Sequence, residues 1–476
     1  METTRKIRNG GYIMKKSMLI CAPFSTRSGY GDHARDLFWS FYDLDRYDIK
    51  LVDVPWGSTP RNALDLNDDK HRILIDKIVS PDSITEQPDI YVDIRIPNEF
   101  QTIGKFNIGI TAGIETNAVS QNWLEHCNKM DLIIVPSEHS KSGFVNTKYD
   151  KVHQSHSGEQ EKVGEFGLSK PIEVLFEGIH LDTYKSISED KLDKKLNSII
   201  NETVKEDFAF LLVGQWIKGN YGEDRKDIPK TIKLFYETFL NKPDKPALIV
   251  KTSGASFSIL DREDILSKIN SIKNQFPDMV RNQLPNVYLI HGDLSTEQMN
   301  SMYNHPKIKS LVSLTHGEGF GRPMLEASMT GLPVMASNWS GQCDFLDENY
   351  SILLGGELVQ VPKSAVWENI IIPQSKWFVA SEDEVRKGFQ FIRFDVNAVN
   401  ENSKKLMEIN RGKFSHKKMT KKLGELLDTH LKTEVTLNLP QLTKVDDKDK
   451  KVDLSQFDDY LANEGVIPNK YVEGVK

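Results

Sequence analysis

Two glutamates and a short run of glycines mark the part of the sequence best suited to chemistry. Glu318 and Glu326 begin and end the segment EGFGRPMLE, and Gly319 and Gly321 lie between them. A carboxylate accepts hydrogen bonds from two adjacent hydroxyl groups, so each glutamate could hold one diol, on a sugar or on a ribose. Glycines let a ligand approach the backbone closely, which suits a phosphate. The segment therefore indicates a site for an extended ligand that carries both kinds of group.

The elements that must position these residues follow from the local pattern. The apolar run SLVSL predicts a buried strand, and THGEGFG after it predicts a glycine-rich turn. Pro323 suits the first turn of a helix, because its missing N–H costs nothing there, and Gly331 suits the residue that ends it. The N–H groups of Gly319, Phe320 and Gly321 would then lie at the positive end of a helix. We expect these three residues to bind a diphosphate.

The same residues carry a resemblance to a known family. EGFGRPMLE and its continuation ASMTGLPVMAS resemble the E-x7-E signature of retaining GT-B glycosyltransferases, a group that includes glycogen and sucrose synthases and many bacterial α-glycosyltransferases. The resemblance extends in order over residues 17–430. It implies two Rossmann-like, doubly wound α/β domains that face a cleft, and transfer of a sugar from a nucleotide-sugar. It also implies that Glu318 holds sugar hydroxyls and Glu326 the ribose.

Two further segments supply candidate cations and a third carboxylate. In LLVGQWIKGNYGEDRKD, Gln215 replaces the family's first basic residue, whereas Arg225 and Lys226 match its later basic pair. Arg225 offers a bidentate fork and Lys226 a point charge, so both suit a departing diphosphate. Glu115 follows a predicted strand at a level where many relatives have a histidine, and we expect it to point toward the cleft. The predicted catalytic residues are Glu318, Lys226, Arg225 and Glu115.

Three more residues complete the predicted donor-binding set. Gly29 and Gly31 are expected in a loop before a helix that begins near Asp32, where the family's loop faces the donor phosphates and the acceptor. Such a pair of glycines can equally be a purely conformational turn. His316, inside the glycine-rich turn, is a candidate for a pocket residue.

The order of apolar and polar segments predicts the domain organisation. Short runs rich in β-branched residues alternate with helix-like segments, and this series restarts in the second half, which is typical of two parallel sheets covered by helices. Ser381 and the glutamate three residues after it predict a capped helix start. The predicted parts are an acceptor-side domain over residues 14–195, a nucleotide-sugar-binding domain over 196–385, with a linker near 185–205, helices over 386–431 that cross back to the first domain, and an irregular tail over 432–476.

Composition narrows the class of protein. The chain has 476 residues and a formal net charge of -7, so nucleic acid is not the expected partner, although a local basic cleft would still permit it. Cys21, Cys127 and Cys343 are far apart, which favours free thiols over a disulfide or zinc framework. No apolar run approaches the roughly 18 residues that a membrane span needs. We expect a cytoplasmic enzyme.

The expected chemistry needs no metal and no cofactor beyond a nucleotide-sugar such as a UDP- or GDP-sugar. Same-face attack through an ion-pair transition state would let the leaving diphosphate accept the proton of a hydroxyl acceptor, a glycan or glycoconjugate. Other readings stay open. They are an epimerase or phosphorylase on the same fold, glycosylation of a modified nucleic-acid base, and a non-catalytic nucleotide-sugar-binding protein.

Overall fold

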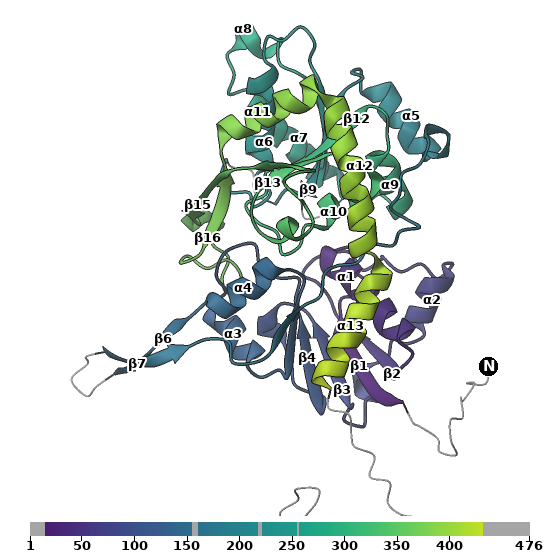
Figure 1. The fold of residues 1–476 in the computed structure, drawn as a ribbon, viewed down its shortest axis with the longest axis vertical. Coiled ribbons are helices and arrows are strands. Elements are labelled where there is room, and N and C mark those ends of the chain that lie inside the picture. Colours follow the sequence, from purple (N-terminus) through teal and green to yellow (C-terminus); the bar gives the residue numbers. More distant parts are fainter. Residues whose placement is uncertain (1–14, 155–159, 218–220, 255–256, 432–476) are drawn as a thin grey trace, which may run out of the picture. The chain divides into compact units, whose positions relative to one another are not determined.

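The computed structural model describes residues 15–154, 160–217, 221–254 and 257–431, which are drawn in colour in Figure 1. These residues belong to one compact unit. The predicted irregular tail, residues 432–476, lies outside the described residues.

A parallel sheet of six strands, in the order β2-β1-β3-β4-β5-β8, forms the core of the first half of the chain. All residues of its β3 are buried, as expected for a strand with helices on both faces of its sheet. The strands are β1 (Lys16–Ala22), β2 (Tyr47–Asp53), β3 (Ile90–Ile94), β4 (Phe106–Ile110), β5 (Leu132–Val135) and β8 (Ile172–Val174). The helices are α1 (Gly29–Asp43), α2 (Asp69–Ile75), α3 (Gln121–Cys127) and α4 (Glu138–Asn146).

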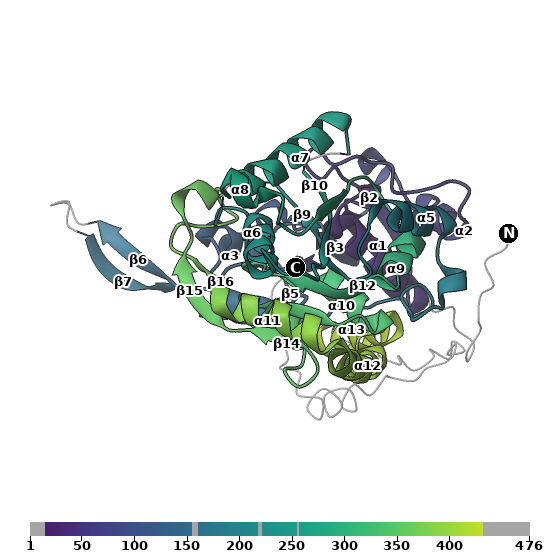
Figure 2. The ribbon, with the colours of Figure 1, turned by 90° about the horizontal axis from the view of Figure 1, so that it is seen from above.

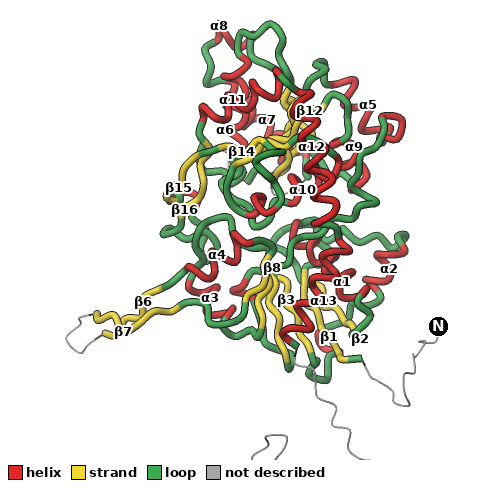
Figure 3. The backbone as a smooth tube through the Cα atoms, in the orientation of Figure 1, coloured by secondary structure: helices red, strands yellow, loops and turns green. Residues whose placement is uncertain are grey.

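An antiparallel hairpin interrupts this series between α4 and β8. It consists of β6 (Tyr149–Gln154) and β7 (Gln160–Phe166), and it extends away from the sheet in both views (Figures 1 and 2). Figure 3 shows its two strands in yellow. The sequence pattern did not predict the hairpin, because its residues are mostly polar and lack the apolar runs of the buried strands.

A second parallel sheet repeats the arrangement in the order β11-β10-β9-β12-β13-β14, with a separate antiparallel pair, β15 and β16. The strands are β9 (Ala209–Gln215), β10 (Ala247–Ser253), β11 (Val287–Ile290), β12 (Ile308–Ser313), β13 (Val334–Ser337), β14 (Ile352–Leu354), β15 (Gly356–Gln360) and β16 (Lys376–Ala380). The helices are α5 (Lys194–Thr203), α6 (Ile228–Phe239), α7 (Ile259–Lys273), α8 (Asp278–Arg281), α9 (Thr296–Tyr303) and α10 (Arg322–Thr330).

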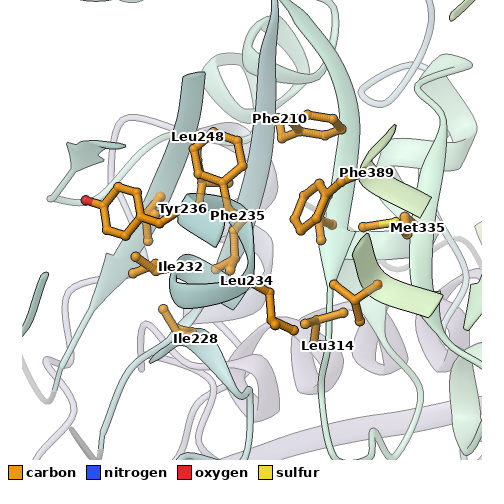
Figure 4. Packing of buried hydrophobic residues seen from close by; sticks show 14 of the residues in the cluster. Phe210, Ile228, Ile232, Leu234, Phe235, Tyr236, Leu248, Leu314, Met335 and Phe389 are labelled. Atoms are coloured by element: carbon orange, nitrogen blue, oxygen red, sulfur yellow. The ribbon is translucent and has the colours of Figure 1, made fainter. Parts of the chain in front are cut away.

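Aromatic side chains fill the core on one face of this second sheet. Phe210 of β9 packs edge-on against Phe389, with ring centroids 5.0 Å apart, and Phe235 of α6 lies 5.8 Å from the same ring. Figure 4 shows these rings among buried aliphatic side chains. The packing joins β9, α6 and a helix from the end of the described chain, so the segment that carries Phe389 belongs to this core.

The last three helices are α11 (Glu382–Phe394), α12 (Val396–Lys413) and α13 (His416–His430), which follow one another along one side of the fold (Figures 1 and 2). Helix α12 packs on α10 beside the second sheet, whereas α13 packs on α1 beside the first. Met419, Leu423 and Leu427 of α13 share one buried cluster with Leu37 and Phe38 of α1. The chain therefore returns to its first half after completing the second.

Three local features differ in detail from their predictions. Helix α1 begins at Gly29 and not near Asp32, because the Ser28 hydroxyl accepts a hydrogen bond from the Gly31 N–H and caps the helix earlier. Ser381 is the N-cap residue of α11, as predicted, but its side chain makes no capping hydrogen bond. The polar stretch predicted as a linker contains helix α5, whose Leu196 and Ile200 are buried.

The two doubly wound parallel sheets confirm the predicted fold class. Among the described helices, none is both long and apolar enough to cross a membrane.

Candidate functional site

The glycine-rich turn leads from β12 into α10, as the sequence predicts. Gly321 precedes the helix with φ 99° and Gly331 ends it with φ 86°, values that favour glycine. The Phe320 side chain is buried against Phe345, with ring centroids 5.2 Å apart, and this contact fixes the turn. The backbone N–H groups of Phe320 and Gly321 donate to no acceptor among the described residues. They remain available to an anion at the helix N-terminus.

Glu318 and Lys226 form a close ion pair beside this turn. The Lys226 Nζ lies 2.6 Å from each carboxylate oxygen of Glu318, although the two residues are 92 positions apart. The side chains are only 16% and 13% exposed. Burial lowers the pKa of Lys226, while Glu318 opposes that effect. Each charge therefore depends on the other for compensation in a poorly solvated place.

Arg225 and Glu115 form a second ion pair next to the first. Glu115 comes from the loop after β4 and Arg225 from the loop before α6, so this pair joins the two halves of the chain. Burial lowers the pKa of Arg225, with Glu318 acting in the opposite direction. A side chain at Gly317 would overlap the Glu115 carbonyl, which shows how closely the loop lies against the turn. The structure thus brings the four predicted catalytic residues together.

Two residues in left-handed or strained backbone conformations hold these groups. Ser340 has φ 79°, and its hydroxyl accepts a hydrogen bond of 2.9 Å from the Glu318 N–H. Asp227 has φ 49° and directly follows Lys226 at the start of α6. Such conformations in residues other than glycine are costly and often lie at functional sites. No role was predicted for either residue, and no motif in the sequence marks them.

The side chain of His316 lies in the interior. Its Nδ1 lies 2.6 Å from the Phe378 carbonyl oxygen, and its ring stacks on Trp377 with centroids 4.2 Å apart. Its Nε2 lies 3.7 Å from an Asp227 carboxylate oxygen. Burial lowers the pKa of His316 to about 4 and raises the pKa of Asp227 to about 8. These contacts let His316 support the loop that carries Lys226, and a direct contact with a donor stays a prediction.

Glu326, the second glutamate of the signature, is buried within a network of side chains. Its Oε1 accepts a hydrogen bond of 3.0 Å from Arg322 Nε, and its Oε2 accepts one of 3.3 Å from the Tyr303 hydroxyl. Burial raises the pKa of Glu326, and Arg322 counteracts it. A carboxylate has four lone-pair positions, so Glu326 can still accept further hydrogen bonds.

Gly29 and Gly31 lie in the first turn of α1. A side chain at Gly31 would overlap the Thr26 carbonyl, so packing alone explains this glycine, whereas a side chain at Gly29 would meet open space. Between them, Tyr30 accepts a hydrogen bond of 3.1 Å from the Ala112 N–H. The Ala112 carbonyl in turn lies directly against Gly319. This chain of contacts connects the start of α1 to the glycine-rich turn.

The Glu177 carboxyl lies in the same network as Glu326 and leads to a testable pH dependence. Burial raises the pKa of Glu177 to about 7, against the effect of Arg322 and with that of Asp36, Asp32 and Glu326. A carboxyl with a raised pKa takes up a proton on folding, so its contribution destabilises the fold as pH rises from about 4.5 to 7. We expect Glu177→Gln to increase the free energy of unfolding by up to about 3 kcal/mol at pH 8.

Urea unfolding at pH 8 and pH 5 checks this expectation for Glu177→Gln. At pH 5 the gain should be below about 1 kcal/mol, because the folded carboxyl is then already protonated. A variant that is less stable than the wild type at both pH values would show that Glu177 stabilises the fold as an anion.

Among known proteins, similarity to this chain is found with solved structures. No protein-family model matches the sequence, and no curated protein matches it. Among solved structures, HepE of Anabaena in complex with UDP and glucose is 12% identical with a TM-score of 0.56, covering 87% of this chain and 100% of that one.

Two other solved structures have a similar fold. Sucrose-phosphate synthase of Thermosynechococcus elongatus is 11% identical, with a TM-score of 0.55, over 87% of this chain and 99% of that one. A glycosyltransferase of Rickettsia africae is 11% identical, with a TM-score of 0.56, over 88% and 100%. With its two Rossmann-like domains and its returning C-terminal helices, the chain has the GT-B fold that these structures share.

Proposed function

We propose that this protein is a retaining glycosyltransferase that moves a sugar from a nucleotide-sugar to a hydroxyl acceptor. The observation that carries the proposal is the buried pair of Lys226 and Glu318 beside the free N–H groups of Phe320 and Gly321. A cation and helix N-terminal N–H groups suit a diphosphate, and the adjoining carboxylate suits sugar hydroxyls.

The two basic side chains of the site suit a reaction in which a diphosphate is the leaving group. In the proposed step, the bond between the anomeric carbon and the diphosphate oxygen breaks, and the acceptor oxygen bonds to that carbon on the same face. The acceptor proton passes to the leaving phosphate oxygen. Arg225 and Lys226 stabilise the charge that develops there, without requiring a metal ion.

The two ion pairs would exchange partners when a donor binds. A diphosphate would compete with Glu115 for Arg225 and with Glu318 for Lys226, because it brings two negative charges and several acceptor oxygens to both cations at once. Glu318 would then be free to accept hydrogen bonds from the sugar. The two pairs keep four charged groups compensated while no donor is bound.

The donor is proposed to be a nucleotide-sugar with its ribose at Glu326. Support comes from the similar folds, because HepE was solved with UDP-glucose as well as with UDP. Glu326 lies about one helical turn after Arg322, the first residue of α10, so one extended ligand could contact the N–H groups at the helix start and this carboxylate together.

The acceptor is proposed to be a saccharide or glycoconjugate. Tyr30 and Trp56 stack with ring centroids 4.1 Å apart, and the Tyr30 hydroxyl is held 2.8 Å from Thr111 Oγ1. Trp56 is partly exposed. A fixed aromatic surface suits the apolar face of a sugar ring. Through Ala112 this surface lies close to Gly319.

A thermal-shift panel with UDP-, GDP- and ADP-sugars tests the donor half of the proposal. A ligand at 100 times its Kd stabilises the folded state by about 2.7 kcal/mol, so at least one of them should raise Tm. Incubation of that donor with saccharide acceptors should then give a glycoside whose anomeric configuration, read by NMR, equals that of the donor. No shift with any nucleotide-sugar, or an inverted product, would contradict the proposal.

A further inference from the structure

Arg322, at the start of α10, contacts carboxylates from three separate elements. Its Nη1 lies 2.6 Å from Asp36 Oδ2 of α1, and its Nε lies 3.0 Å from Glu326 Oε1 of α10 itself. Its Nη1 also lies 3.8 Å from Glu177 Oε2, in the segment after β8. The Arg322 side chain is 18% exposed, so these contacts lie in a largely desolvated place.

Asp36, the partner of Arg322, is itself held by contacts with two histidines. His180 Nε2 lies 3.2 Å from Asp36 Oδ1, and His416 Nε2 lies 3.0 Å from the Asp36 backbone oxygen. The two imidazole rings stack with centroids 4.2 Å apart. Burial raises the pKa of Asp36, but Arg322 and His180 outweigh it and hold the pKa well below its usual range. Asp36 therefore remains a carboxylate, held by the segment after β8 through His180, while its backbone oxygen contacts α13 through His416.

The planar guanidinium reaches both sides of this network at once. Its Nε faces Glu326 while its Nη1 faces Asp36, a geometry that a lysine ammonium cannot reproduce. Arg322 therefore links the Glu326 carboxylate to α1, a helix of the first half of the chain. No other basic side chain among the described residues contacts Glu326.

We propose that Arg322 is a positioning residue that makes nucleotide binding at Glu326 and the contact of α10 with α1 mutually dependent. This inference rests on the proposed function, which places the ribose of the donor at Glu326. The Glu326 carboxylate that would accept the ribose hydroxyls also accepts from Arg322 Nε, so its orientation and the placement of the guanidinium on Asp36 depend on each other. Because such coupling is reciprocal, weakening the Arg322 contact with Asp36 should weaken nucleotide binding.

The test compares nucleotide affinity in variants of this contact. Asp36→Asn keeps the shape of the side chain but removes its charge. Arg322→Lys keeps the positive charge but removes the planar guanidinium that contacts Glu326 and Asp36 at the same time. Asp428→Asn is the matched control, because Asp428 pairs with Arg46 at 2.6 Å and is 66% exposed, away from Arg322. Isothermal titration with UDP, GDP and ADP comes first on the wild type, and the tightest ligand is used throughout.

We expect Asp36→Asn and Arg322→Lys each to raise the Kd of that nucleotide by about tenfold, within the usual range of coupling between sites, and Asp428→Asn to change it by less than about twofold. A second measurement is hydrogen exchange along α1. The nucleotide should slow exchange in α1 of the wild type and have a much smaller effect there in Asp36→Asn, a difference that loss of stability alone does not produce.

The outcomes separate this inference from the proposed function. If the wild type binds none of the three nucleotides, the proposed donor site is wrong and the inference is wrong with it. If the wild type binds but both variants keep its Kd and its exchange response, only the coupling is wrong. Should Asp36→Asn fail to fold, Arg322→Lys carries the comparison alone.

Discussion

Replacing Lys226 with methionine is expected to lower kcat by about 10²–10³-fold, the usual effect of removing one group that stabilises charge in a transition state. Methionine has a similar length but no charge, so the leaving diphosphate would lose the cation that now lies 2.6 Å from Glu318. The loss should exceed any increase in KM, because the charge on the diphosphate grows as its bond to the sugar breaks. Initial rates at saturating donor measure the effect.

The control is Lys233→Met on α6. Lys233 is 35% exposed and lies 3.9 Å from Glu237, outside the turn, so its loss should leave kcat within about twofold. The double variant Lys226→Met/Glu318→Gln should unfold at higher temperature than Lys226→Met alone, because the single change leaves a buried carboxylate without its partner. A folded Lys226→Met enzyme with wild-type kcat would contradict the assignment.

The sequence predicts those parts of the fold that local patterns determine. The parallel strands are continuous apolar runs, and the turn into α10 carries Gly321, Pro323 and Gly331, each at a position that the backbone requires. Both sheets and this helix were therefore predictable. The hairpin β6–β7 was not, since its strands lie outside both buried sheets and carry no apolar run.

The contacts within the site could be predicted only in part. The resemblance singles out Glu318 and Lys226 separately, but their ion pair joins residues 92 positions apart, and local patterns carry no information on such distances. Ser340 positions Glu318 through a backbone conformation that its residue type disfavours, so propensity argues against it. Arg322 lies within the signature, yet its partner Asp36 lies 286 positions away.

The requirement for glycine at position 319 was predicted only in part. The sequence predicts a glycine here for the close approach of a phosphate, whereas the structure places the Ala112 carbonyl where a side chain would be. Ser137 also donates a hydrogen bond of 2.5 Å to the Gly319 carbonyl. Gly319 is thus a point of direct backbone contact between the two halves of the chain, next to Glu318.

Replacing Gly319 with alanine is consequently expected to have a large effect. The φ of Gly319 is not in the left-handed region, so the cost comes from the overlap of the new Cβ with the Ala112 carbonyl and not from the backbone conformation. To relieve the overlap the turn must shift by about 1 Å, and it carries Glu318 with it. Misplacement of a catalytic group by that distance can cost about 10²-fold in rate. We expect kcat to fall by about that factor.

The matched control is Gly412→Ala. Gly412 lies in α12, and a side chain there meets no atom within 4 Å. Alanine is the better helix former by about 0.5–1 kcal/mol, so this variant should be active and at least as stable as the wild type. Gly319→Ala should also lower Tm, because overpacking usually costs about 1–3 kcal/mol. If Gly319→Ala kept both the Tm and the kcat of the wild type, the backbone contact with Ala112 would have no part in placing Glu318.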